Sequence, residues 1–189
     1  MEKVVVNNEI YYIHKGKVCD SSFIEVPKGL ADKVMESALA NIWSVDIQEK
    51  ELLDMPESEL VDYAKRLKED MDYIKCLRVI QYGMRRFNKS VHYYRTVFPM
   101  ITSCYRSLNQ PQKAISFWDE HKQLFVSCLS PALLTSLAAA YCDVGNYEMA
   151  RKCANKAYAM NGGYKNCEVE LTMVYMRLDT LCCKVNQDE

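Results

Sequence analysis

Glycine and proline are scarce in this sequence, which has 6 Gly and 5 Pro among 189 residues. Sandwiches and barrels need many tight turns, and these two residues supply most of them, so a many-stranded fold is disfavoured. Helices joined by short loops are favoured instead. Hydrophobic residues make up 49% of the chain, which is enough for the core of one domain or one repeat array.

The net charge is close to zero, and the sequence has no long apolar run. The 24 Lys and Arg balance 25 Asp and Glu, which argues against a polycation or an acidic disordered tail. No stretch approaches the roughly 18 apolar residues of a membrane-spanning helix, so no membrane partner is expected. Charge is nevertheless segregated, because residues 44–72 hold ten acids and four bases, whereas residues 73–125 hold nine bases and two acids. The simplest interpretation is that adjacent helices neutralise each other, and a basic surface for an acidic partner is the alternative.

The usual signatures of catalysis and cofactor binding are absent. Neither of the nucleotide-binding motifs GxxxxGK and GxGxxG occurs. Cys and His pairs with the spacing of a zinc site are also absent from the sequence. The 9 cysteines are odd in number and follow no secretory signal pattern, so we expect reduced thiols and a cytoplasmic location. We therefore expect no enzyme activity, no catalytic residue, no cofactor and no metal. The alternative is a thiol enzyme, in which a cysteine nucleophile lies next to His14, His92 or His121 in the folded protein although the two residues are distant in sequence.

The first 26 residues differ in composition from the rest of the chain. They are rich in β-branched and aromatic residues, with turn-forming pairs at Asn7-Asn8 and Lys15-Gly16. We expect a small N-terminal β-hairpin of two or three short strands, which offers a second contact surface. Such a hairpin is marginal alone in water, so its apolar side chains are expected to pack on the helical body or on a partner. These side chains are Val5, Ile10, Tyr12, Ile13 and Phe23.

Residues 27–93 form a predicted helical region. Apolar residues recur at helical spacing over 29–43, and further helices are predicted over 58–69 and 71–87. An acidic connector separates them at 44–57. Residues 58–93 could form a degenerate copy of the repeat that follows.

A period of 34 residues appears in the C-terminal half. Leu137, Ala138 and Tyr141 are followed by Gly145 and then by alanines at 150, 154 and 157, and the same order recurs upstream and, in half, downstream. The matching residues are Phe98, Ile101, Thr102, Tyr105, Ala114 and Trp118 upstream, and Leu171 and Tyr175 downstream. This pattern resembles the tetratricopeptide repeat (TPR), a pair of antiparallel helices. A third first helix is expected at 165–178, and Thr180–Glu189 is expected to be the cap or the truncation of the array.

The resemblance implies that residues 94–189 stack as a short TPR-like solenoid of helical hairpins. Such arrays bind peptides or helices of other proteins on a concave face, so the expected function is that of a protein-interaction adaptor. The alternative occupant of the groove is this chain's own terminal segment or its first helix. The residues implied to line the groove are Thr96, Ser103, Arg106, Ser107, Ala132, Thr135, Ser136, Ala139, Cys142, Asp143, Val169, Met173, Met176 and Arg177.

A second possible function depends on the basic segment around residue 90. Arg85, Arg86, Lys89 and Arg95 alternate there with aromatic residues, a mixture that can contact phosphates and stack on bases. The alternative hypothesis is therefore a nucleic-acid-associated accessory protein that uses segment 73–125. The same pattern also fits a helix end, where cations complement the helix dipole.

Overall fold

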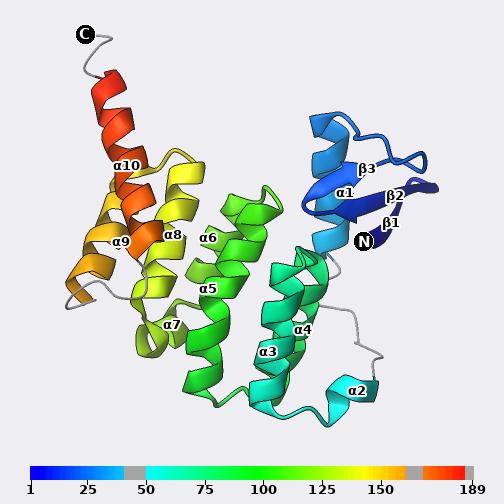
Figure 1. The fold of residues 1–189 in the computed structure, drawn as a ribbon, viewed down its shortest axis with the longest axis horizontal. Coiled ribbons are helices and arrows are strands. Elements are labelled where there is room, and N and C mark those ends of the chain that lie inside the picture. Colours follow the sequence, from blue (N-terminus) through cyan, green and yellow to red (C-terminus); the bar gives the residue numbers. More distant parts are fainter. Residues whose placement is uncertain (41–49, 161–167, 186–189) are drawn as a thin grey trace. The chain divides into compact units, whose positions relative to one another are not determined.

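The computed structural model describes residues 1–40, 50–160 and 168–185, and these contain ten helices and a three-stranded sheet (Figure 1). The prediction of a mainly helical protein with a small N-terminal β element is confirmed. The chain divides into two compact units. The first contains Met1–Tyr93 and Ser107–Asn109, and the second contains Tyr94–Arg106 and Gln110–Glu189. Among the described helices, each is too short or too polar to cross a lipid bilayer.

The N-terminal sheet is a meander of three antiparallel strands in the order β1 (Glu2–Val6), β2 (Glu9–His14) and β3 (Lys17–Cys19). Both connections are two-residue turns with left-handed backbone. Asn7 and Asn8 have φ of 52° and 65°, and Lys15 and Gly16 have φ of 51° and 79°. Asn and Gly tolerate this region, which is why the two turns were predictable from sequence.

The two faces of the sheet differ in burial. Helix α1 (Lys28–Ala40) packs on β1 and β3 and covers one face (Figure 1). Ile13 lies on this covered face, but Val5, Ile10 and Phe23 remain 58%, 38% and 61% exposed. Of the five side chains expected to pack on the helical body or on a partner, Ile13 is therefore covered within the unit, whereas Val5, Ile10 and Phe23 are not. Because side chains alternate between faces, the covered positions are the intervening ones: Val4, Tyr11, Ile13 and Val18.

Three helices complete the first unit: α2 (Lys50–Leu53), α3 (Glu57–Glu69) and α4 (Tyr73–Arg86). The predicted helices at 29–43, 58–69 and 71–87 are confirmed to within a few residues, except that 41–43 lie outside the described residues. Helices α3 and α4 pack together along buried aliphatic side chains, which include Leu60, Ala64, Leu67, Ile74, Leu77 and Ile80.

The second unit is built from helices that pack in succession. Its elements are α5 (Val91–Ser107), α6 (Pro111–Glu120), α7 (Lys122–Cys128), α8 (Pro131–Asp143), α9 (Tyr147–Met160) and α10 (Glu168–Val185); the two ends of α5 belong to the first unit. Helix α8 contacts α6 and α9, and α10 contacts both α8 and α9. Phe98 on α5 lies 6.1 Å from Phe117 on α6, measured between ring centroids. Helix α7 was not predicted. The helix predicted at 165–178 is present from Glu168 and continues to Val185, and residues 165–167 lie outside the described residues.

The α8–α9 hairpin shows why the repeat positions need small residues. Ala138 and Ala150 are 0% exposed, and small side chains allow two helix backbones to approach closely. Ser130 caps α8 by accepting a hydrogen bond from the backbone N–H of Leu133. Gly145 follows α8 with φ of 78°, a conformation that favours glycine and ends the helix.

Candidate functional site

The residues that the sequence assigned to a partner lie on three helices of the second unit. Each of these, α5, α8 and α10, is the first helix of its predicted hairpin. Thr96, Ser103 and Arg106 are on α5; Ala132, Thr135, Ala139 and Asp143 are on α8; Met173 and Arg177 are on α10.

Three of these residues meet in one ionic cluster, which we call the Asp143 cluster: Arg106, Asp143 and Arg177. The Nε of Arg106 donates to Oδ2 of Asp143 at 2.5 Å, and an Nη of Arg177 donates to Oδ1 at 2.8 Å. The partners are separated by 37 and 34 residues. The Asp143 cluster therefore joins α5, α8 and α10: Arg106 and Asp143 lie at the C-terminal ends of α5 and α8, and Arg177 lies within α10.

The Asp143 cluster carries a surplus positive charge. Each carboxylate oxygen of Asp143 accepts from one guanidinium, so two positive charges share one negative charge. The side chains of Arg106, Asp143 and Arg177 are 29%, 25% and 40% exposed, which leaves the arginines accessible to a ligand. An additional carboxylate brought by a partner would balance the surplus charge.

Three of the predicted contact residues are buried within the unit, among them Cys142, which is 4% exposed. Thr135 is 1% exposed and Ala139 is 7% exposed. They lie in the packing of α8, so they offer almost no surface to a partner, in contrast to the open floor implied by the repeat pattern. Within the described residues, Oγ1 of Thr135 has no hydrogen-bond partner.

Helix α10 carries an exposed hydrophobic row, which we call the α10 row: Val169, Met173 and Met176. These side chains are 73%, 58% and 64% exposed. Their spacing of four and three residues places them on one face of the helix. The helix is anchored through other positions, where Leu171, Val174 and Leu178 are buried. Arg177 immediately follows the row and joins it to the Asp143 cluster.

Two described cysteines of the second unit, Cys142 and Cys153, have raised pKa values. Burial raises the pKa of Cys142, although the nearby guanidinium of Arg177 acts to lower it. Burial also raises the pKa of Cys153 to about 11. A thiol attacks as its thiolate, so these environments do not activate a nucleophile. In the described ranges, no three His, Cys, Asp or Glu side chains are grouped so that they could hold a metal ion.

The four basic residues proposed to contact nucleic acid differ in their surroundings: Arg86 forms hydrogen bonds within the first unit, and the other three have exposed side chains. Arg86 donates to the backbone carbonyls of Leu52 and Met55 at 2.7 Å and 2.9 Å, and its guanidinium lies over the ring of Phe87. Its charge therefore stabilises the first unit. Arg85 and Lys89 are exposed in that unit, whereas Arg95 is exposed in the second unit.

Sequence reasoning selected the members of the Asp143 cluster but not their pairing. The available signal was that an arginine or an aspartate follows the repeat tyrosine within two residues in each copy: Arg106 after Tyr105, Asp143 after Tyr141 and Arg177 after Tyr175. Comparison of the chain with protein-family models, curated proteins and solved structures finds no match.

Proposed function

We propose that this protein is a non-enzymatic adaptor that binds a helix or peptide of another protein on the face formed by α5, α8 and α10. The observation that carries the proposal is the exposed α10 row beside the Asp143 cluster. Hydrophobic side chains that lie together on a surface are characteristic of interaction sites, whereas isolated ones are common on any protein.

The chemistry of this face suggests which partner it binds. Val169, Met173 and Met176 can bury apolar side chains, and methionine adapts its shape to different partners. The surplus charge of Arg106 and Arg177 favours an acidic residue beside those apolar groups. We therefore expect an amphipathic acidic segment, in a helical or extended conformation.

A cytoplasmic location belongs to the same proposal. The described Cys19, Cys76, Cys104, Cys128, Cys142 and Cys153 are free thiols, and free thiols persist where the compartment is reducing. An adaptor in that compartment needs no cofactor.

The test compares capture of partner proteins from the native host by the wild type and by a Met173→Ser/Met176→Ser variant. We expect the double variant to lose at least about tenfold in affinity for the captured partner, because two apolar contacts are removed. Circular dichroism should be unchanged, since both side chains are exposed. Met160 is also an exposed methionine, 44% exposed at the end of α9, so Met160→Ser is the matched control.

Charge provides a second arm of this experiment. Arg177→Glu should weaken capture and reduce its dependence on salt, because the partner's acidic residue loses its attraction. Undiminished capture by the double methionine variant would contradict the proposed surface.

A further inference from the structure

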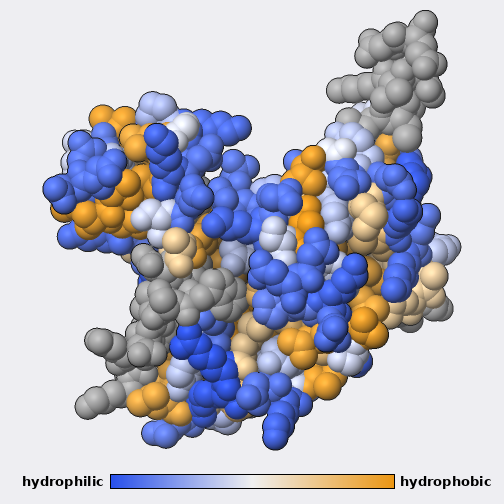
Figure 2. Space-filling model, turned by 180° about the vertical axis from the view of Figure 1, so that it is seen from behind, coloured by the Kyte–Doolittle hydropathy of each residue, from blue (hydrophilic) through white to orange (hydrophobic). Residues whose placement is uncertain are grey.

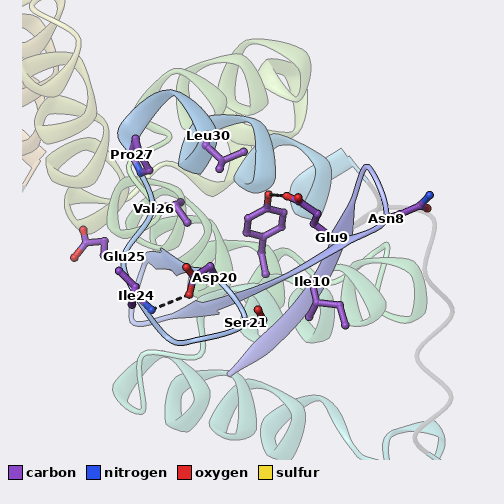
Figure 3. A pocket seen from close by; sticks show the side chains of 11 residues that line it. Asn8, Glu9, Ile10, Asp20, Ser21, Ile24, Glu25, Val26, Pro27 and Leu30 are labelled. Carbon is purple, nitrogen blue, oxygen red and sulfur yellow. Dashed lines mark hydrogen bonds between the residues drawn. The ribbon is translucent and has the colours of Figure 1, made fainter.

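A groove lies beside the first half of β2, at the N-terminal sheet (Figure 3). Its volume is about 620 Å³. Glu9, Ile10 and Tyr11 form one wall, and the segment from Asp20 to Leu30 forms the other. We call it the β2 groove. Hydrophobic residues reach the surface of the part formed by the sheet and α1 (orange at the upper left of Figure 2).

Among the described residues, none forms a hydrogen bond with the backbone N–H or C=O of Ile10, which lines this groove. The Asn7-Asn8 turn makes Val6 and Glu9 the pair that exchanges hydrogen bonds, and the direction of bonding alternates along an antiparallel strand. The N–H and C=O of Ile10 therefore point away from β1. On that side β3 pairs only with Tyr12, Ile13 and His14. Half of this edge of β2 is thus available to another strand.

The opposite wall is held in a fixed conformation. Oδ1 of Asp20 accepts hydrogen bonds from the backbone N–H groups of Ser22 and Ile24 at 2.8 Å and 3.0 Å. Phe23 adopts a left-handed φ of 61°, which is unusual for a bulky side chain, and its ring stacks on Tyr12 at 5.1 Å. This turn directs Ile24, which is 65% exposed, to the rim of the groove.

The β2 groove combines aliphatic and negative groups. Ile10, Ile24, Val26 and Leu30 supply apolar surface, and the charged residues that line it within the described ranges are Glu9, Asp20 and Glu25. Glu25 pairs with Lys17 at 2.7 Å. In the part of the chain that the structure describes, neither Glu9 nor Asp20 pairs with a cation, so the groove keeps a net negative charge.

We propose that the β2 groove binds an extended segment of a partner protein that carries bulky aliphatic residues alternating with Lys or Arg. The segment lies beside β2 and exchanges backbone hydrogen bonds with Ile10. Its cations lie on the face of the sheet that carries Glu9 and neutralise Glu9 and Asp20, and its aliphatic side chains point to the opposite face and contact Ile10 and Ile24. This site is in the first unit, so it does not depend on the proposed function of the α10 row.

The test uses the full chain and two labelled hexapeptides, TKVKVT and its charge-reversed form TEVEVT. Fluorescence anisotropy should show that the basic peptide binds at least about tenfold more tightly than the acidic one. In NMR spectra the amide of Ile10 should shift on addition of the basic peptide. A basic peptide with methylated backbone nitrogens should bind more weakly, because it cannot donate to β2.

Two variants locate the binding site. Glu9→Lys should weaken the basic peptide at least about tenfold, and Ile24→Ser should weaken both peptides. The matched controls are Glu36→Lys, an exposed acid on α1, and Val126→Ser, an exposed aliphatic on α7; both should leave affinity unchanged. Equal binding of the two peptides, or binding unaffected by Glu9→Lys and Ile24→Ser, overturns the proposal. Dimerisation that Ile24→Ser abolishes would also overturn it, because the occupant would then be a second copy of this chain.

Discussion

At the scale of single residues, Gly83 shows how packing sets the identity of one position. Tyr93 is 1% exposed, and its hydroxyl donates to the backbone carbonyl of Ile80 at 2.8 Å. A Cβ atom at Gly83 would lie 1.9 Å from that hydroxyl oxygen and 2.7 Å from a methyl of Leu60. The sequence does not reveal this contact, because the helical spacing around Gly83 does not show which side chain of another helix packs against it.

Gly83→Ala is expected to destabilise the protein by about 1–3 kcal/mol, because the added methyl group displaces Tyr93 and weakens its hydrogen bond. Urea unfolding followed by circular dichroism measures the change. Gly29→Ala is the matched control, since a Cβ at that helical position meets nothing within 4 Å. It should be neutral or stabilising. Equal stability of the two variants would contradict the packing described for Tyr93.

At the scale of elements, most of the helices were predictable and the orientation of the sheet was not. Helices carry a 3.6-residue stripe with one apolar face, so their existence follows from sequence. Strand β1 contains Val4, Val5 and Val6 in succession, and β2 has apolar side chains on both of its faces. Because side chains alternate between the two faces of the sheet, both faces are apolar in sequence. The position of α1 decides which face is buried. The pairing within the Asp143 cluster escaped prediction because it joins residues from three helices.

Ala138→Leu should destabilise the α8–α9 hairpin by roughly 1–3 kcal/mol, because the position is fully buried where the helices approach. Thermal unfolding provides the measurement. Ala159, an exposed alanine on α9, offers the control Ala159→Leu, which should change stability little. Unchanged stability of Ala138→Leu would show that the two helices are not closely packed at this point.

At the scale of the whole molecule, the buried Tyr141 and the half-buried Cys153 make the free energy of unfolding depend on pH in the alkaline range. Burial raises the pKa of Tyr141 from 10.0 to about 12 and that of Cys153 from 9.0 to about 11. Above pH 9 the unfolded chain loses these protons before the folded chain does. The folded state then binds more protons, so the free energy of unfolding falls as pH rises towards about 12.

The urea midpoint should therefore be lower at about pH 10.5 than at about pH 8, and Cys153→Ala should reduce the difference. Cys153 should also react slowly with iodoacetamide near neutral pH, because little thiolate forms. A midpoint that rises over this range would contradict the burial of these groups.

The shared carboxylate of Asp143 makes the three helices unequal in their tolerance of substitution. Loss of either arginine leaves the aspartate paired with the other. Arg106 on α5 and Arg177 on α10 can therefore be substituted independently of each other. Loss of the aspartate leaves two guanidinium groups close together without a counterion, and their repulsion acts on both flanking helices at once. A substitution of Asp143 on α8 therefore affects both α5 and α10, whereas a substitution of either arginine affects one contact.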